Sequence, residues 1–155
     1  MSKYTYISDS ELATKSFAKK LAAKLNKGDV VVLTGELGAG KTKFTEGFLS
    51  CFNLEDEISS PTFTIVNEYK TEKVTVYHFD VYRLENVDEF YAIGGEEYFE
   101  NGICIIEWGK LIQDALPENY IEVLLKKDET NDNKRILIIE THGNIPNLEE
   151  ILWEL

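Results

Sequence analysis

The sequence predicts an α/β protein with a central mixed, mostly parallel β-sheet that is flanked by helices in three layers. Two observations predict this fold. Short, wholly apolar runs rich in β-branched residues alternate with segments of helical spacing, which is typical of strands covered on both faces. The chain has 155 residues, 43% of them hydrophobic and 28% charged, close to globular averages. We therefore expect a single domain over 1–155 with one hydrophobic core.

Composition excludes several classes of protein. The chain has 16 basic and 28 acidic residues, a formal charge of −12, and its basic residues do not form a block that would grip nucleic acid directly. No apolar run approaches the roughly 20 residues that span a bilayer. The first residues lack the apolar section of a signal peptide. We expect a cytoplasmic protein without membrane contact, whose Cys51 and Cys104 are plain buried thiols.

The first elements are a helix and a buried strand. Ser8 and Glu11 have the spacing of a capping box, and apolar residues then recur at helical spacing, which predicts a helix over 9–26. Gly28 ends that pattern. The run over 29–33, DVVVL, is continuously apolar after its aspartate and predicts a strand that leads into a glycine-rich segment.

The later elements follow from alternating apolar runs and turn residues. A second helix is expected over 42–51, directly after the glycine-rich segment, and a hairpin over 63–69 and 74–79. Further on, the sequence predicts a short helix from 88–91 that ends at Gly94 and Gly95, a strand over 103–107, a short helix over 111–116, strands over 120–125 and 135–140, and a helical face over 148–155.

The segment from Gly35 to Thr42 reads GELGAGKT and matches the phosphate-binding pattern G-x-x-x-x-G-K-[ST]. Glycines let the backbone curl so that its N–H groups face phosphate oxygens, and the following helix N-terminus adds partial positive charge. Lys41 would reach the β and γ phosphates, and the Thr42 hydroxyl would be a magnesium ligand. The strand before and the helix after this segment supply the context that a P-loop requires.

A P-loop enzyme also needs a carboxylate at the end of a neighbouring strand to hold magnesium. Glu107 ends the strand over 103–107, and Asp80 follows the strand over 74–79. Spacing alone does not decide which one serves the metal and which orients the attacking water. Thr62 is a candidate switch hydroxyl for the γ-phosphate. His78, between two aromatic residues, is interpreted as a packed or hydrogen-bonding side chain, not as a general base.

Other nucleotide-dependent classes fit less well. A GTPase needs N-K-x-D and D-x-x-G, and the chain has no D-x-x-G; Asn133-Lys134 begins the first motif without its aspartate. A small-molecule kinase generally clamps the transferred phosphate with several arginines, whereas this chain has only Arg83 and Arg135. From the residues alone a kinase is the second candidate. A nucleotide-switched adaptor without catalysis is the third.

Taken together, the motifs resemble the TsaE (YjeE) ATPases, which take part in making threonylcarbamoyladenosine beside the anticodon of bacterial tRNA. The resemblance spans nearly the whole chain. It rests on five ordered blocks: GELGAGKT at 35–42, SPTFTIVNEY at 60–69, HFDVYRL at 78–84, GGEEYF at 94–99, and IIEWG at 105–109 followed by LP at 116–117.

The resemblance implies roles for particular residues. Glu107 would partner Thr42 in holding Mg²⁺, Asp80 would serve hydrolysis with Lys41, and Thr62 would contact the γ-phosphate. The nucleotide-binding residues that it implies are Thr14, Glu36, Leu37, Gly38, Ala39, Gly40, Lys41, Thr42, Lys43, Trp108 and Arg135. Glu36 and Lys43 depart from the aspartate and threonine that many members carry there, and neither change opposes ATP binding.

The resemblance also implies partners and a cofactor. The expected function is ATP binding and hydrolysis, with Mg²⁺, in support of threonylcarbamoyl transfer to tRNA. The expected partners are the TsaB and TsaD subunits, and contact with tRNA would be indirect, through that complex. The ATPase activity is expected to be weak in the isolated chain.

Overall fold

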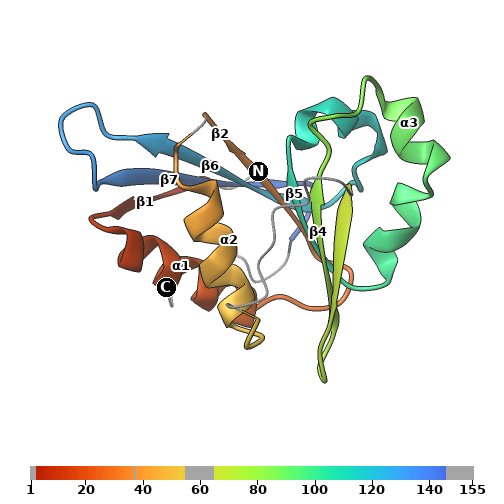
Figure 1. Ribbon diagram of the computed structural model, residues 1–155, viewed down its shortest axis with the longest axis horizontal. Coiled ribbons are helices and arrows are strands. Elements are labelled where there is room, and N and C mark those ends of the chain that lie inside the picture. Colours follow the sequence, from red (N-terminus) through yellow and green to blue (C-terminus); the bar gives the residue numbers. More distant parts are fainter. Residues whose placement is uncertain (1–2, 37, 55–64, 146–155) are drawn as a thin grey trace.

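The computed structural model describes residues 3–36, 38–54 and 65–145. Within these ranges one seven-stranded sheet has the order β1-β7-β6-β2-β5-β4-β3 (Figure 1). The strands are β1 (Lys3–Ser8), β2 (Val30–Gly35), β3 (Val66–Lys70), β4 (Thr75–Asp80), β5 (Ile103–Glu107), β6 (Tyr120–Lys127) and β7 (Arg135–His142). The helices are α1 (Glu11–Ala23), α2 (Lys41–Ser50) and α3 (Val87–Ala92), with 3-10 helices η1 (Gly95–Glu100) and η2 (Gly109–Ala115).

The sheet is mixed, as the sequence predicts. β2 pairs in parallel with β5 and β6, and β4 pairs in parallel with β5. The antiparallel pairs β3–β4, β6–β7 and β1–β7 lie toward the two edges. Because β1 is antiparallel to β7, which is antiparallel to β6, five of the seven strands (β1, β2, β4, β5 and β6) run in one direction. The carboxyl ends of the central strands therefore meet at one edge.

Helices cover both faces of the sheet, so the expected three layers are present. In Figure 1, α1 and α2 lie on one side and α3 lies on the other. The alternation along β2 explains this arrangement, because successive side chains of a strand point to opposite faces. Val31 and Leu33 join the cluster that contains Phe44 and Phe48 of α2, whereas Val32 joins the cluster that contains Phe90 of α3.

Helices α1 and α2 cross very closely at Gly47. A Cβ atom added to this glycine would lie 2.2 Å from the carbonyl oxygen of Lys15, so only a residue without a side chain fits. Beside the crossing, Glu46 accepts from Lys15 at 3.0 Å and from Lys43 at 3.5 Å. Burial raises the pKa of Glu46, but the two lysines together hold it below its ordinary value. The Lys15–Glu46 pair and the close crossing at Gly47 thus join α1 to α2.

The N-terminal part of the fold differs from expectation. Residues 3–8 form β1, an edge strand that the sequence reasoning did not predict, and Ser8 is its last residue. The predicted capping box at Ser8 is therefore wrong: Ser10 is the N-cap of α1, and its hydroxyl accepts from the Ala13 N–H at 3.0 Å. The 3-10 helix η1 was also not predicted. The predicted tail helix over 148–155 lies outside the described residues.

The other predicted elements are present, with boundaries that shift by a few residues. The strand expected over 29–33 extends through Gly35, and both C-terminal strands are longer than predicted. Cys104 is buried, as expected, and burial raises the pKa of its thiol to about 12. Cys51 is only half-buried, so the expectation of a fully buried thiol is wrong at this position.

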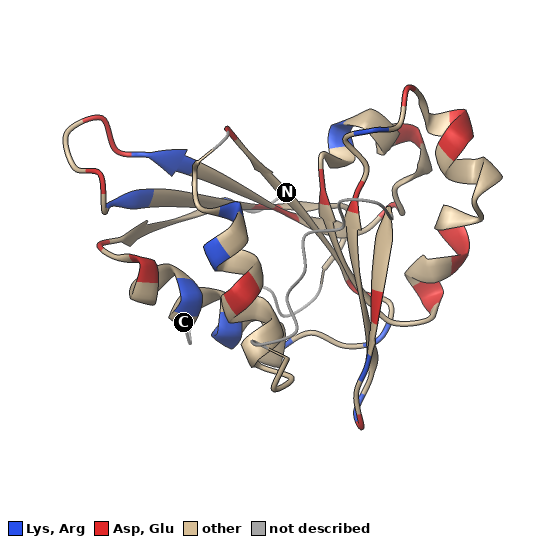
Figure 2. Ribbon diagram, in the orientation of Figure 1, with Lys and Arg blue, Asp and Glu red and all other residues tan. Residues whose placement is uncertain are grey.

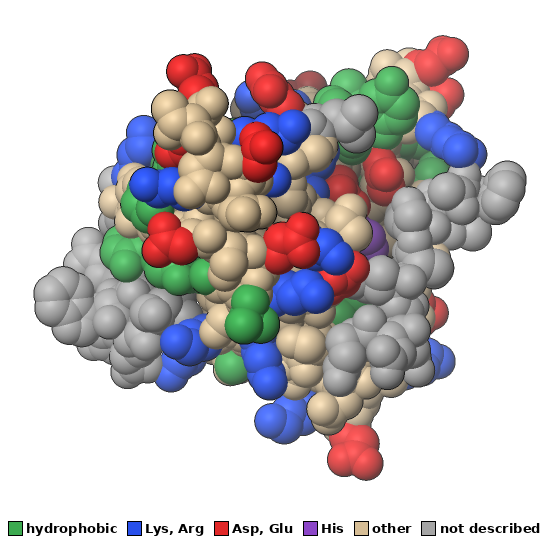
Figure 3. Space-filling model, turned by 60° about the vertical axis from the view of Figure 1, so that its left-hand side comes forward, with side chains coloured by type: hydrophobic (Ala, Val, Ile, Leu, Met, Phe, Trp, Pro, Cys, Tyr) green, Lys and Arg blue, Asp and Glu red, His purple; other side chains and the backbone are tan. Residues whose placement is uncertain are grey.

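Charge is unevenly spread over the described surface. Basic side chains occur mainly on α1, α2 and the ends of β6 and β7, whereas α3 and η1 are acidic (Figure 2). The face in Figure 3 mixes acidic and basic side chains without a continuous basic surface. None of the helices in the described ranges is long and apolar enough to cross a bilayer.

Candidate functional site

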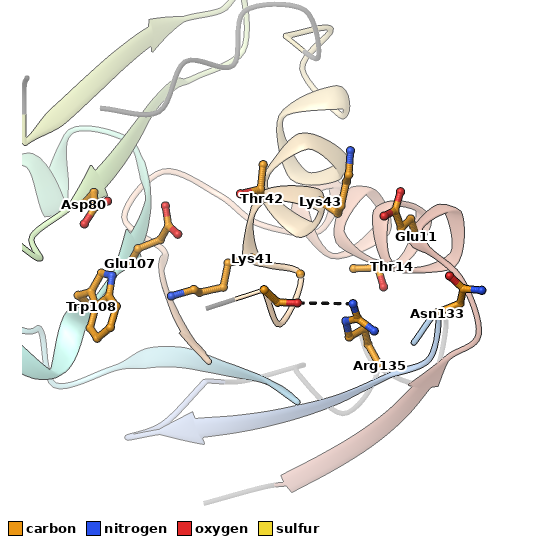
Figure 4. Close-up of a pocket in the computed structure, with 12 residues that line it drawn as sticks. Glu11, Thr14, Lys41, Thr42, Lys43, Asp80, Glu107, Trp108, Asn133 and Arg135 are labelled. Atoms are coloured by element: carbon orange, nitrogen blue, oxygen red, sulfur yellow. Dashed lines mark hydrogen bonds between the residues drawn. The ribbon is translucent and has the colours of Figure 1, made fainter. Parts of the chain in front are cut away.

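A pocket of about 360 Å³ opens at the sheet edge where the central parallel strands end (Figure 4). It is bounded by the start of α1, the glycine-rich loop, the start of α2, the ends of β4 and β5, and the turn before β7. Its lining residues are Glu11, Thr14, Gly38, Gly40, Lys41, Thr42, Lys43, Asp80, Glu107, Trp108, Asn133 and Arg135.

The glycine loop joins β2 to α2 and depends on glycine conformations. Gly38 and Gly40 have φ of +80° and +105°, in the left-handed region that side chains rarely adopt. Gly35 has φ +155°, and a Cβ atom there would lie 2.8 Å from the Leu125 carbonyl oxygen. Three glycines at this spacing are therefore required by the backbone itself.

The N-terminus of α2 faces this pocket with its first N–H groups available. Gly40 is the N-cap and offers no side-chain hydrogen bond, so no described side chain satisfies the N–H groups of the first turn. An uncapped helix N-terminus combines free N–H donors with partial positive charge, which favours an anion. Lys41 and Thr42, the first residues of α2, line the pocket beside it.

The Lys41 ammonium lies over the ring of Trp108, with Nζ 4.5 Å from the ring centroid. Trp108 follows β5 and adopts φ +66°, an uncommon conformation for a residue with a side chain. Its ring also packs against Tyr82 with centroids 4.9 Å apart, and it remains 40% exposed. Figure 4 shows Lys41 extending across the pocket toward this ring.

Two carboxylates end neighbouring strands at the pocket. Asp80 of β4 and Glu107 of β5 are direct partners in the parallel register. Asp80 Oδ1 accepts from the Tyr82 N–H at 3.1 Å, while Glu107 Oε2 lies 2.8 Å from His78 Nε2. The structure thus brings both candidate acids into one pocket with Lys41 and Thr42.

The opposite end of the pocket contains Thr14, Lys43 and Arg135. Thr14 is 1% exposed, and its hydroxyl lies 2.6 Å from that of Ser8, so α1 and β1 fix it. The Arg135 guanidinium donates to the Lys134 carbonyl at 2.9 Å and to the Gly38 carbonyl at 3.5 Å, the dashed contact in Figure 4. Arg135 therefore links β7 to the glycine loop.

Some of the predicted site residues do not line this pocket. Glu36 is exposed, and Ala39 is 1% exposed and packs into the core, where its N–H donates to the Glu36 carbonyl at 3.0 Å. Leu37 and Thr62 lie outside the described residues. Glu11, Asn133 and His78 were not predicted at the site. His78 was detectable, because it precedes Asp80 by two residues and so points to the same face of β4.

A second group of titratable side chains lies on β6 and β7. Ligand atoms of Glu122, Glu140 and His142 lie within 4.8 Å of one another. Each has a protein contact: Glu122 accepts from Thr34 at 3.0 Å, Glu140 pairs with Lys3 at 3.6 Å, and His142 stacks on Tyr120 with ring centroids 4.3 Å apart. These contacts account for the group without an ion.

The fold and the pocket together define a class: an α/β protein whose glycine loop and uncapped helix N-terminus face two strand-end carboxylates. Comparison with known proteins identifies the family within this class. The family model described as "Threonylcarbamoyl adenosine biosynthesis protein TsaE" matches residues 8–137. The chain belongs to the TsaE family, whose members take part in threonylcarbamoyladenosine biosynthesis.

Similarity to individual proteins supports the same family assignment. The Bacillus subtilis protein called "tRNA threonylcarbamoyladenosine biosynthesis protein TsaE" is 42% identical over 132 residues, which cover 84% of this chain and 81% of the relative. A Rickettsia felis protein with the same name is 40% identical over 147 residues, 94% of this chain and 85% of the relative. The crystal structure of YdiB from Bacillus subtilis superposes with a TM-score of 0.74 at 32% identity, covering 99% of this chain and 93% of YdiB.

Proposed function

We propose that this chain is a P-loop ATPase with a P-loop NTPase-like fold, which binds ATP and Mg²⁺ in the described pocket. Its hydrolysis of ATP would support formation of the threonylcarbamoyl group on the adenosine beside the tRNA anticodon, together with the TsaB and TsaD subunits in the cytoplasm. One observation carries the proposal: the uncapped N-terminus of α2, Lys41 and two strand-end carboxylates converge on one pocket.

The pocket chemistry suits a triphosphate with its metal. N–H groups of the glycine loop and α2 would receive the phosphates, and Lys41 would move from Trp108 to the β and γ phosphates. The Thr42 hydroxyl and the Glu107 carboxylate are oxygen donors of the kind that Mg²⁺ prefers. Glu107 Oε1 makes no hydrogen bond to a described residue, so it is available to a metal or its water shell. Bound Mg²⁺ would neutralise charge on the transferred phosphoryl group.

The remaining pocket residues have positions that fit nucleotide binding. Asp80 would orient the attacking water, since it is the second acid beside the expected γ-phosphate position. Thr14 and Arg135, at the opposite end of the pocket, would contact the adenosine end of the nucleotide, whereas Trp108 would lie beside the nucleotide near Lys41. Thr62 is proposed as a γ-phosphate contact. Among the described residues Arg135 is the only arginine that lines the pocket, which disfavours the arginine clamp of a kinase.

Phosphate release by purified protein tests the proposal. We expect slow release from the chain alone and faster release after addition of TsaB and TsaD, because the acidic chain would act through protein partners. Equal release in both conditions would contradict partner activation. No release in either condition, with ATP still bound, would favour the nucleotide-switched adaptor.

Substitution of the two acids separates their roles. Glu107→Gln should raise the Mg²⁺ concentration for half-maximal turnover and lower maximal turnover by about 100-fold, since loss of one electrostatic contact typically costs 10²–10³. ATP binding without metal should stay within about a factor of three, because Coulombic changes at partly exposed sites are small. Asp80→Asn should lower turnover by about 100-fold, a typical loss for a group that handles the water proton. Its Mg²⁺ dependence should match that of the wild type, and a shifted dependence would reverse the two assignments.

Tryptophan emission reports the movement of Lys41. The chain has two tryptophans, so Trp153→Phe leaves Trp108 as the only emitter. ATP should change its emission, because Lys41 has to leave the ring to reach the phosphates. The lost cation–π contact is worth about 0.5–1 kcal/mol at such a site, so Trp108→Phe should alter ATP affinity by no more than roughly fivefold through this contact. Emission unchanged at saturating ATP would contradict the movement.

A further inference from the structure

We propose that His78 is a positioning residue that holds the Glu107 carboxylate in one orientation, so that Oε2 is occupied and Oε1 faces the pocket. The inference rests on the proposed function of Glu107 as a metal ligand. The inference assigns a role to a residue that does not line the pocket. His78 lies on β4, one row of side chains further into the sheet than Asp80 and Glu107.

The contact is short and largely buried. His78 Nε2 lies 2.8 Å from Glu107 Oε2, and the two side chains are 5% and 16% exposed. In the parallel register His78 is opposite Ile105, one row inward from the paired Asp80 and Glu107. A carboxylate only accepts hydrogen bonds, so Nε2 carries the proton and donates it.

The surroundings of His78 argue against a role in packing alone. Its neighbours on the same sheet face are Val76 and Ile105, both completely buried in the apolar core, and Asn67, its register partner on β3. An apolar residue would fill this position without any polar cost. His78 instead leaves Nδ1 buried with no hydrogen-bond partner among the described residues. A buried polar atom without a partner costs free energy, and such costs concentrate at functional sites.

The hydrogen bond from His78 restricts the orientation of the Glu107 carboxylate. A glutamate side chain has several rotatable bonds, and its terminal carboxylate torsion is broad. The bond from Nε2 removes this freedom before any ligand arrives. Residues that orient metal ligands in this way typically change metal affinity or activity by 10- to 100-fold when they are replaced. The hydrogen bond from His78 therefore fixes the orientation of the Glu107 carboxylate.

The test is the Mg²⁺ dependence of ATP binding, measured by titration calorimetry on the full chain. His78→Leu removes the donor and keeps an apolar side chain. It should raise the half-saturating Mg²⁺ concentration by about 10- to 100-fold. ATP binding in the presence of a metal chelator should remain within twofold of wild type, a separation that a general loss of structure would not produce.

Two further variants make the comparison specific. His78→Gln places an amide N–H three bonds beyond Cβ, as in the imidazole, so it should restore most of the Mg²⁺ affinity. His142→Leu is the matched control, because His142 is the only other histidine and also contacts a glutamate, Glu122, at 3.0 Å, outside the pocket. It should leave the Mg²⁺ dependence unchanged. Unchanged Mg²⁺ dependence in His78→Leu, or no recovery in His78→Gln, would overturn the proposal.

Two outcomes separate this inference from the proposed function. If the wild-type chain binds ATP without any Mg²⁺ dependence, the metal role of Glu107 fails, and the positioning role fails with it. If the wild type is Mg²⁺-dependent and His78→Leu behaves like it, only the positioning role fails. Should the leucine variant not fold, nitrogen NMR of the wild-type ring decides: we expect a protonated Nε2, and a protonated Nδ1 with bare Nε2 would exclude the donation.

Discussion

Lys41→Ala is expected to weaken ATP binding by about 10- to 150-fold, the equivalent of roughly 1.5–3 kcal/mol for hydrogen bonds to a charged group. Hydrolysis should fall further, by about 10²–10³, because a positioned charge stabilises the transition state more than the bound substrate. The reason lies in the position of Lys41 at the first turn of α2, beside the glycine loop and in the same pocket as Glu107. Calorimetry and phosphate release measure the two effects separately.

The control for this variant is Lys19→Ala. It removes the same side chain and the same charge from the exposed face of α1, outside the pocket lining. We expect ATP affinity within about twofold of wild type, as is usual for exposed charges screened by solvent. Similar losses in both variants would mean that net charge, and not the position of Lys41, governs binding. The P-loop assignment would then be wrong.

Gly47→Ala should destabilise the protein although it adds a single methyl group. The new Cβ would lie 2.2 Å from the Lys15 carbonyl oxygen and 2.5 Å from the Lys15 Cα atom, so α1 and α2 would have to move apart. Overpacking costs about 1–3 kcal/mol, and the obstacle here is backbone, so we expect the upper end of that range despite the helix propensity that alanine gains. For a chain of this length, such a loss of stability should lower the melting temperature by about 4–10 °C.

A matched surface change separates packing from helix propensity. Ser16→Ala alters an exposed position of α1 next to Lys15 and should leave the melting temperature within about 2 °C. Thermal unfolding followed by circular dichroism gives both values. A melting temperature for Gly47→Ala equal to or above that of wild type would show that the two helices are not held at the described separation.

The parts of the fold that the sequence predicts are those with local signals. The strand before the glycine loop, the loop and α2 follow from an apolar run, left-handed glycines and helical spacing within residues 29–51. β1 lacks such a signal, because it is an edge strand with exposed Lys3, Thr5 and Ile7. Its partner is β7, which lies more than a hundred residues later in the chain. Because its partner is so distant in the sequence, the residues of β1 show no local hydrophobic pattern that would identify the strand.

The site was predictable to a similar degree. Lys41 and Thr42 follow from the motif itself, and Asp80 and Glu107 follow as acids at strand ends. Their direct pairing depends on the parallel register of β4 and β5, which spacing along the chain does not reveal. The same register determines that His78 reaches Glu107, which confirms the interpretation of His78 as a packed or hydrogen-bonding side chain and identifies its partner. Resemblance to a family suggested individual roles, whereas the orientation of the Glu107 carboxylate depends on its contact with His78 in the folded chain.

The pocket lining extends from Glu11 near the start of the chain to Arg135 in β7. During synthesis a ribosome releases residues in order, and the glycine loop emerges long before the turn that places Arg135 against Gly38. Strand β1 likewise cannot form its sheet pairing until β7 has been synthesised. A nascent chain therefore carries the complete glycine-rich motif before β7, the last of the described strands, has been made, and the pocket gains its Arg135 wall only after that strand is translated.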